Sequence, residues 1–387
     1  MHAEFVVDVI QGGAGTSTNM NANEVIANRA LEILGHARGE YRYCHPLDHV
    51  NLSQSTNDVY PTAINVGLHF AIGRLLLAMD GLREAFEDKS REFAEVLKMG
   101  RTQLQEAVPI TLGQEFSTYA VMLEEDQQRL REARDLVVEV NLGATAIGTG
   151  INTDPAYAPL VCRILADLSG IALVTSPNLI EATQDVGAFV QLSGVLKRIA
   201  VKLSKVCNDL RLLSSGPRAG IGEIALPAVQ AGSSIMPGKV NPVIPEVVNQ
   251  IAFEVIGNDM TVTMAAEAGQ LQLNAFEPII AHSLFESLQH LAAGCRTLAE
   301  RCVRGITANR DRARRLLDES TAVVTALTPY LGYAESTAIA KDALATGKKV
   351  YDLVLARGLM TKQQLDDLLK PESLTRPHYR SAQTPKQ

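Results

Sequence analysis

The residues best suited to chemistry lie in one loop that is rich in glycine, serine and proline. It reads AGSSIMPGKVNP and runs from 231 to 242. Its glycines permit close backbone approach, its prolines stiffen the exit, and Lys239 supplies a fixed positive charge. Backbone N–H groups beside Ser233 and Ser234 could stabilise a serine alkoxide or a substrate oxyanion. The pattern predicts an anion-binding loop, because a mobile connector has no need of Lys239 and Asn241 at this spacing.

Three further segments, 12–23, 51–58 and 100–105, concentrate hydroxyls, amides and glycines between apolar stretches. Polar segments of this kind are usually turns, and none is diagnostic alone. Their side chains nevertheless share one chemistry, because neutral donors and acceptors can bind carboxylates and an amine closely without titrating. The residues of this type are Thr16, Ser17, Ser55, Thr56, Asn57, Thr102 and Gln103.

Other kinds of active site are not indicated. The sequence has no GxSxG nucleophile elbow, no HExxH motif and no Cys/His spacing typical of zinc. The glycines at 12, 13 and 15 do not form GxGxxG, so a nucleotide site is not expected. A net charge of −7 leaves no basic face for nucleic acid. We predict no metal, no cofactor and no nucleic-acid partner.

The distribution of proline predicts long helices, because proline inside a helix removes a hydrogen bond. Four proline-free stretches, 62–101, 110–154, 178–216 and 246–277, far exceed the average helix of about 11 residues. In the third, apolar residues recur at seven-residue intervals in two interleaved series, which is typical of a packed helix seam. The fourth is apolar on all sides, as expected at the centre of a bundle or an oligomer. We predict an all-α fold, a long-helix bundle.

Past Pro329 the pattern changes to short segments. Thr361 and Gln364 form a capping box that opens a brief helix, and Pro371 stops it. This predicts a small helical C-terminal domain followed by a disordered polar tail at 376–387. The cysteines form no CxxC pair, and we find neither a secretory leader nor a stretch suited to span a bilayer. We therefore expect a cytoplasmic protein without membrane contact.

The loop GSSIMPGKVNP from Gly232 is similar to the signature loop of the fumarase/aspartase superfamily. The resemblance covers nearly the whole chain and includes GAGTSTNMNANEVIAN from Gly13, VNLSQSTNDVYPTA from Val50 and GRTQLQEAVPITLGQEF from Gly100. Fumarases typically carry a histidine where this chain has Gln103, and a further histidine in the stretch that corresponds to EATQDVGA. Their absence favours the aspartase branch of the superfamily.

The resemblance implies a lyase that converts L-aspartate reversibly into fumarate and ammonia. Ser233 would be the general base that removes a proton from Cβ, leaving an aci-carboxylate dianion. Hydrogen bonds to that dianion strengthen in the transition state, which is the condition for catalysis. These bonds would come from Thr16, Ser55, Thr56 and Ser234. The α-carboxylate would be bound by Lys239, Asn241, Thr102 and Gln103, and the departing amine by Asn57. Glu246 matches a carboxylate that orients a histidine in fumarases, so its role is open here.

The resemblance also implies a homotetramer with sites shared between subunits. We expect a remnant of an N-terminal domain at 1–56, a central bundle with the signature loop at 57–312, and the C-terminal domain at 313–387. Family members usually begin well upstream of the segment that matches near Met1, so the true start is left open. Two alternatives remain: fumarate hydratase on the same scaffold, and an inactive oligomeric helical protein that lacks its N-terminal region.

Overall fold

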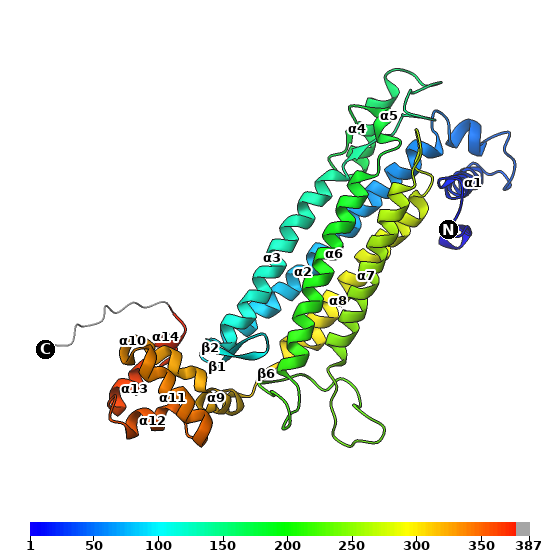
Figure 1. Cartoon of the computed structure of the whole chain (residues 1–387). Helices are drawn as coiled ribbons and strands as arrows, with labels where there is room; N and C mark the ends of the chain where they lie inside the picture. Colours follow the sequence, from blue (N-terminus) through cyan, green and yellow to red (C-terminus); the bar gives the residue numbers. More distant parts are fainter. Residues whose placement is uncertain (377–387) are drawn as a thin grey trace. The chain divides into compact units, whose positions relative to one another are not determined.

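The computed structural model describes residues 1–376, most of which are helical (Figure 1). They form two compact units, each assembled from three segments of the chain. Unit 1 contains Met1–Asp80, Glu124–Ser204 and Val247–Cys295, and unit 2 contains Gly81–Leu123, Lys205–Glu246 and the chain from Arg296 onward. The domain boundaries expected at 56/57 and 312/313 stay predictions. The tail expected to be disordered lies, from residue 377, outside the described residues.

Five long helices contribute to both units, so the predicted all-α long-helix bundle is confirmed. They are α2 (Thr56–Glu92), α3 (Leu112–Leu136), α6 (Gly187–Leu213), α7 (Val243–Glu267) and α8 (Glu277–Arg301). The predicted seam of α6 is buried along its whole length, from Leu192 to Leu213. The proline rule missed α8 as a separate helix, because Pro278 stands in its first turn, where a missing N–H removes no helical bond.

Helix α2 begins earlier than the proline pattern predicted and contains Pro61. Proline lacks an N–H, so the carbonyl of Asn57 loses its usual helical partner four residues on. The side-chain amide of Asn141 donates to that carbonyl at 2.9 Å and replaces the lost bond. The stretch 110–154 also differs from prediction, since α3 ends at Leu136. The chain after it makes β3 and a loop with positive φ at three glycines.

Unit 1 also holds the N-terminal elements and a small apolar cluster beneath α4. Its further elements are a 3₁₀ turn (His2–Glu4), α1 (Thr16–Ile33), a π-helical turn (Pro46–Val50), β3 (Glu139–Val140), α4 (Tyr157–Ser169), β4 (Val174–Thr175) and α5 (Leu179–Ala182). The strands β3 and β4 pair in parallel, next to the buried Leu142 and Leu173. The segment 12–23 was predicted as a polar loop, but α1 starts within it, at Thr16.

Unit 2 contains an antiparallel hairpin that the sequence did not predict, made of β1 (Leu97–Thr102) and β2 (Gln105–Thr111). Between α6 and α7 lies β5 (Ile224–Ala225), which pairs with β6 (Thr307–Ala308). The helices after β6 are α9 (Arg310–Glu319), α10 (Thr328–Leu331), α11 (Tyr333–Thr346), α12 (Val350–Ala356), α13 (Lys362–Leu368) and α14 (Pro371–Leu374), with 3₁₀ turns at Val303–Gly305 and Thr321–Leu327.

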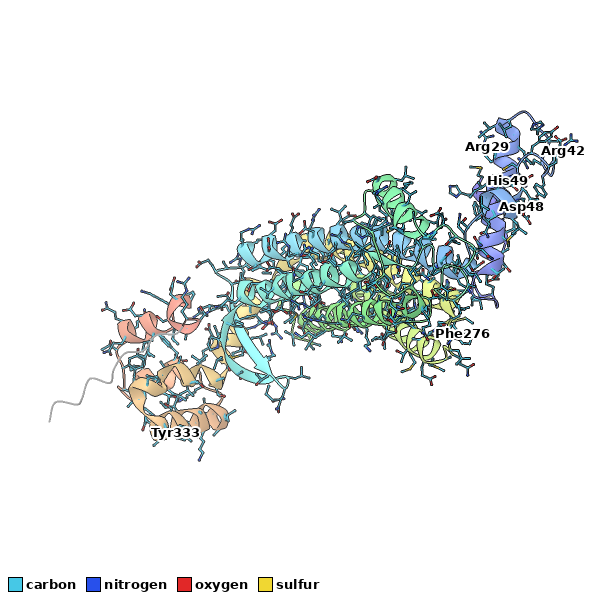
Figure 2. All side chains as sticks on the ribbon, turned by 90° about the horizontal axis from the view of Figure 1, so that it is seen from above. Arg29, Arg42, Asp48, His49, Phe276 and Tyr333 are labelled. Atoms are coloured by element: carbon cyan, nitrogen blue, oxygen red, sulfur yellow. The ribbon has the colours of Figure 1, made fainter. Side chains whose placement is uncertain are left out.

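The predicted capping box at Thr361 is present and opens α13. Ile339, Val354 and Leu365 are buried together in one apolar cluster of these helices. Tyr333, at the start of α11, is instead 81% exposed and lies on the outside of this group (Figure 2). The expected small helical C-terminal region is therefore present, with a core of its own.

Two long helices carry apolar surface that the chain itself leaves uncovered. By length and composition alone, α2 could cross a membrane, and 44% of its most apolar stretch is buried. The expectation that no stretch is long and apolar enough was therefore wrong, because the apolar residues of a long bundle helix also meet that criterion. On α7, Phe253, Met260 and Met264 are more than 60% exposed. This agrees with the prediction of a helix that is apolar on all sides.

Candidate active site

Thr16 stands at the first turn of α1, where backbone N–H groups point outward and favour an anion. The turn before it needs Gly15, which has φ +89° and lies against the ring of Tyr60, so that a Cβ there would meet the ring at 2.5 Å. The hydroxyl of Thr16 donates to the carbonyl of Gly13 at 2.8 Å. Thr16 is exposed and therefore accessible to a ligand.

Ser55, Thr56 and Asn57 occupy the start of α2, a second helix N-terminus. The Ser55 hydroxyl accepts the N–H of Asn57 at 3.2 Å, and the carboxylate of Asp58 accepts the N–H of Ser55 at 3.1 Å. These reciprocal bonds form a capping arrangement that stabilises the first turn of the helix. All three predicted residues are half-buried, so each could be reached by a small ligand.

Asn19 joins the two helix starts and was missed in the sequence analysis. It lies one turn after Thr16 in α1, and its amide donates to the hydroxyl of Thr56 at 3.0 Å and to the side-chain oxygen of Asn51 at 3.2 Å. Asn23 donates to the same oxygen at 3.0 Å. Of the predicted residues of unit 1, Thr56 thus belongs to a hydrogen-bonded network with Asn19, Asn23 and Asn51. The only signal in the sequence was the run of asparagines in the quoted motif NMNANE.

Asp58 and Asn57 fasten the start of α2 to the loop that follows β3. Asp58 is fully buried and accepts the N–H of Thr145 at 2.8 Å, and burial raises the pKa of its carboxyl to about 6, while its backbone hydrogen bonds act to lower it. The amide N–H of Asn57 donates to the carbonyl of Ala146 at 2.8 Å. That bond leaves the side-chain oxygen of Asn57 as an acceptor, which suits an amine.

In unit 2, the signature loop closes on itself. The amide of Asn241 donates to the carbonyl of Gly232 at 2.6 Å and joins the two ends of the loop. Gly232 permits no side chain, because a Cβ there would overlap the carbonyl oxygen of Lys239. Gly238 has φ +78°, which a side chain disfavours. The two glycines therefore provide the close approach and the unusual angle that the sequence predicted.

The hydroxyl oxygen of Ser233 lies where two backbone amides can stabilise negative charge on it. It accepts the N–H of Ile235 at 3.2 Å and the N–H of Met236 at 3.1 Å. Ser233 is half-buried, while Ser234 and Lys239 are exposed. Amides aimed at an oxygen in this way lower the cost of an alkoxide.

A cavity of about 470 Å³ lies beside the exit of this loop, within unit 2. Lys239 and Asn241 line it, together with Arg211, Ser214 and Asn309. The last three were not predicted as site residues. Apolar side chains, among them Ile224, Leu226 and Val240, line the rest of the cavity, so its polar groups are cationic or neutral and its walls are largely apolar.

Thr102 and Gln103 lie at the tip of the β1–β2 hairpin, where Thr102 pairs with Gln105. The two turn residues, Gln103 and Leu104, have φ of +52° and +63°. Hairpin turns of this type favour asparagine and glycine, so the tip is strained. Strain of this kind is often retained where a side chain must be presented to a ligand.

A buried ion-pair network supports this hairpin. The ammonium of Lys98, only 1% exposed, lies 2.7 Å from a carboxylate oxygen of Glu115 and 3.0 Å from one of Glu223. Arg101, two residues before Gln103 in the turn, forms an ion pair with Glu223 at 3.0 Å. Glu223 directly precedes β5, so the network ties the hairpin to that strand. Removing one member would leave an uncompensated buried charge.

The predicted residues therefore form one set in each unit. Thr16, Ser55, Thr56 and Asn57 belong to unit 1, and Thr102, Gln103, Ser233, Ser234, Lys239 and Asn241 belong to unit 2. Glu246 lies in the first turn of α7 in unit 2. Each set presents neutral donors at helix starts or turns, and unit 2 adds the cation. Neutral donors and a cation are, in general, groups that can bind a carboxylate.

Comparison with known proteins identifies the family to which the chain belongs. Residues 1–257 match a family model described as lyase, and residues 323–376 match the fumarase C C-terminus. The chain belongs to this lyase family, the fumarase/aspartase superfamily, and is an enzyme of the carbon–nitrogen lyase class.

Individual relatives show which members of the family the chain resembles in sequence. The chain is 59% identical to the aspartate ammonia-lyase of Helicobacter pylori, with 97% of this chain and 81% of that protein covered. It is 54% identical to the Escherichia coli aspartate ammonia-lyase, with 98% and 79% covered. Among solved structures it matches a Brucella melitensis protein, described as a fumarate lyase:delta crystallin bound to cobalt, with a TM-score of 0.95 and 59% identity over 97% and 82% of the chains. A class II fumarase from Schistosoma mansoni matches with a TM-score of 0.91 and 35% identity, over the same shares.

Proposed function

We propose that this chain catalyses the reversible deamination of L-aspartate to fumarate and ammonia. The observation that carries the proposal is identity of 54% or more, over nearly the whole chain, to several aspartate ammonia-lyases. The site chemistry supports it, because both sets of residues suit a small dicarboxylate with an amine.

Ser233 acts as the general base in this proposal. A serine hydroxyl is a weak base, so its alkoxide needs stabilisation before it can remove a proton from carbon. The amides of Ile235 and Met236 already donate to its oxygen, and Lys239 supplies positive charge from the same loop. The Cβ proton passes to the serine oxygen, and the electron pair spreads into the β-carboxylate.

The dianion that results is bound at helix starts. Thr16, Ser55 and Thr56 present hydroxyls at the N-termini of α1 and α2, where the helix dipole also favours negative charge. The Thr16 hydroxyl exchanges its bond to the carbonyl of Gly13 for one to the dianion. Ser234, exposed beside the base, adds a fourth donor. Because the extra charge exists only after proton removal, these bonds lower the barrier more than they tighten ground-state binding.

The remaining groups hold the other end of the substrate. Lys239 and Asn241, with Thr102 and Gln103 from the hairpin tip, bind the α-carboxylate. The side-chain nitrogen of Asn57 donates a hydrogen bond to the carbonyl of Ala146 and so orients the side-chain oxygen, which accepts a hydrogen bond from the ammonium group. When the C–N bond breaks, the electron pair of the carbanion forms the double bond of fumarate and ammonia leaves.

We further propose a homotetramer with sites shared between subunits, located in the cytoplasm. The predicted site residues fall into two separate units, and α7 presents an exposed apolar face. Apolar patches of this kind usually mark protein–protein contacts. All five cysteines are free thiols, which suits a reducing compartment. Sedimentation of the purified chain measures the assembly.

A fumarate-release assay tests the reaction. With L-aspartate as substrate, the wild type should produce ultraviolet absorbance from fumarate, and Ser233→Ala should lower kcat by about 100- to 10,000-fold, the usual contribution of a general base. Ser117→Ala, which removes a hydroxyl from α3 whose bond is to its own helix, is the matched control and should keep full activity. An active Ser233→Ala enzyme would exclude Ser233 as the base.

Fumarate hydratase remains the second candidate function, because the chain matches a class II fumarase and a fumarase C C-terminal region. Turnover of L-malate, compared with L-aspartate on one preparation, decides between the two. We expect L-aspartate to be the faster substrate. Turnover of neither substrate by a tetrameric chain would favour the third hypothesis, an inactive helical oligomer.

A further inference from the structure

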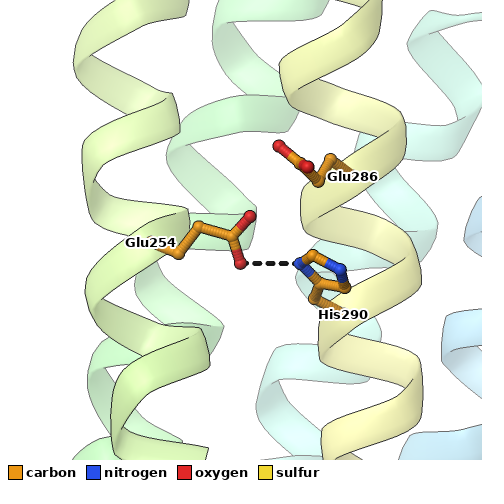
Figure 3. Close-up of side chains that lie close together, drawn as sticks. All are labelled: Glu254, Glu286 and His290. Atoms are coloured by element: carbon orange, nitrogen blue, oxygen red, sulfur yellow. Dashed lines mark hydrogen bonds and ion pairs between the residues drawn. The ribbon is translucent and has the colours of Figure 1, made fainter.

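Three side chains that are potential metal ligands meet between α7 and α8, within unit 1. Glu254 projects from α7, and Glu286 and His290 project from α8 toward it (Figure 3). Glu286 and His290 are four residues apart and therefore share one face of α8. One ligand atom from each of the three residues lies within 4.8 Å of the others.

The charges of these carboxylates are not balanced by lysine or arginine. The Nδ1 atom of His290 lies 2.6 Å from a carboxylate oxygen of Glu254. Glu286 lies 3.6 Å from the Nε2 atom of His282, one turn before it on α8. Among the residues that the structure describes, both carboxylates form ion pairs with histidine only, and a histidine is charged only when protonated. When these histidines are neutral, the two negative charges lack a cationic partner.

The donor set favours a particular class of cation. One imidazole nitrogen and two carboxylate oxygens suit first-row divalent transition metals such as Zn²⁺ and Co²⁺. Mg²⁺ binds oxygen almost exclusively, so the histidine disfavours it. Two carboxylates would neutralise a divalent charge. The side chains are between one third and two fifths exposed, so water can complete the coordination sphere.

We propose that Glu254, Glu286 and His290 bind one divalent transition-metal ion between α7 and α8. The ion takes the place of the proton in the hydrogen bond between Nδ1 of His290 and the carboxylate of Glu254. Metal–ligand distances of about 2.1 Å place ligand atoms about 3 Å apart. Rotation of the Glu286 side chain brings the present spacing of up to 4.8 Å into that range. The bound ion cross-links two neighbouring helices and stabilises the fold by mass action.

This site is separate from the residues proposed for deamination, none of which it includes. Its test is therefore independent of the proposed function. Removal of the ion is expected to leave the groups at Ser233 and at the start of α2 in place. A failed metal test would leave the aspartate assay unaffected, and a failed assay would leave the metal test unaffected.

Direct binding to the purified, metal-free full chain tests the proposal, with Co²⁺ as probe. Equilibrium dialysis should give one bound Co²⁺ per chain, with visible absorption from the coordinated ion, and Co²⁺ should raise the melting temperature. Glu254→Gln and His290→Ala should each weaken binding by at least about tenfold and remove the thermal shift. His36→Ala is the matched control, because His36 forms a similar pair with Glu40 that lacks a third ligand.

Three results would overturn the proposal. The first is no stoichiometric Co²⁺ binding by the wild type. The second is unchanged binding in both variants. The third is an equal loss of binding in His36→Ala. If His290→Ala fails to fold, Glu254→Gln still decides the question, because it removes one charge and keeps the shape of the side chain.

Discussion

The start of α2 in unit 1 and the signature loop in unit 2 hold their polar residues in opposite ways. At the start of α2, the buried carboxylate of Asp58 binds two backbone amides, and Asn57 and Thr56 each have a partner from another segment. The signature loop is mostly exposed, and the hydrogen bonds described for Ser233 and Asn241 stay within the loop. The start of α2 is therefore anchored to other segments of unit 1, whereas the signature loop is held by hydrogen bonds between its own residues.

Under the proposed mechanism, the two regions have different roles. Donors that stabilise a transition state act best when they are preorganised, which the anchored helix starts provide. A general base that needs exclusion of water is better placed on a segment that can close over the substrate. We expect substitutions at the anchor to affect stability together with activity, and substitutions in the loop to affect activity alone.

The largest expected effect concerns a buried carboxyl in unit 1. Burial raises the pKa of Glu277, at the start of α8, from 4.5 to about 8. The folded state binds the proton of Glu277 more tightly than the unfolded state. The contribution of protonated Glu277 to the free energy of unfolding is therefore fully present below pH 4.5 and is lost as pH rises through about 8. Relative to Glu277→Gln, the wild type should lose on the order of 5 kcal/mol of unfolding free energy between these limits. Denaturant unfolding at several pH values measures this. Parallel pH profiles for both proteins would contradict it.

Gly232→Ala tests whether the loop must close on its own backbone. The added Cβ would overlap the carbonyl of Lys239, so the backbone around Ser233 must shift. A misplacement of about 1 Å can cost about 100-fold, and we expect kcat/KM for L-aspartate to fall by that factor. The melting temperature should stay near that of the wild type. Gly12→Ala is the control, because a Cβ there meets no atom within 4 Å. If Gly232→Ala loses stability in parallel with activity, the signature loop does not differ from the start of α2 in the way described.

Asp58→Asn breaks the anchor of unit 1. An amide cannot accept at both oxygens, so one buried backbone N–H loses its partner, at a cost of about 1 to 3 kcal/mol. Denaturant unfolding should show this loss together with a higher KM. Asp154→Asn provides the comparison, since Asp154 makes a similar bond to a backbone amide on the surface. Equal stability of both variants would show that Asp58 is not an anchor.

The smallest effect is expected at the hairpin tip. Gln103→Gly should relieve the strain of the positive φ and stabilise the protein by about 0.5 to 1 kcal/mol. The KM for L-aspartate should rise, because the side-chain amide is lost. Leu104→Gly relieves similar strain without removing the amide and should leave KM unchanged. Thermal unfolding and initial rates on the two variants separate strain from substrate contact. A raised KM in both variants would mean that the strained tip, and not the amide of Gln103, is required.

Local patterns predicted much of this protein. The seam of α6, the capping box at Thr361 and the need for glycine at 232 depend on residues close in sequence, and helix periodicity or backbone geometry suffices to derive them. The superfamily was equally accessible, because its signature loop is contiguous. The β1–β2 hairpin was not predicted, since neither turn residue is a usual turn former.

Contacts between distant segments could be read only from the tertiary structure. The bonds from Asn19 to Thr56, from Thr145 to Asp58 and from Arg101 to Glu223 join residues far apart in the chain, so no local pattern encodes them. The meeting of Glu254 with His290 likewise depends on which faces α7 and α8 turn toward each other. The physical reason is that residue types and local geometry depend on neighbours along the chain, whereas the position of a functional group depends on packing.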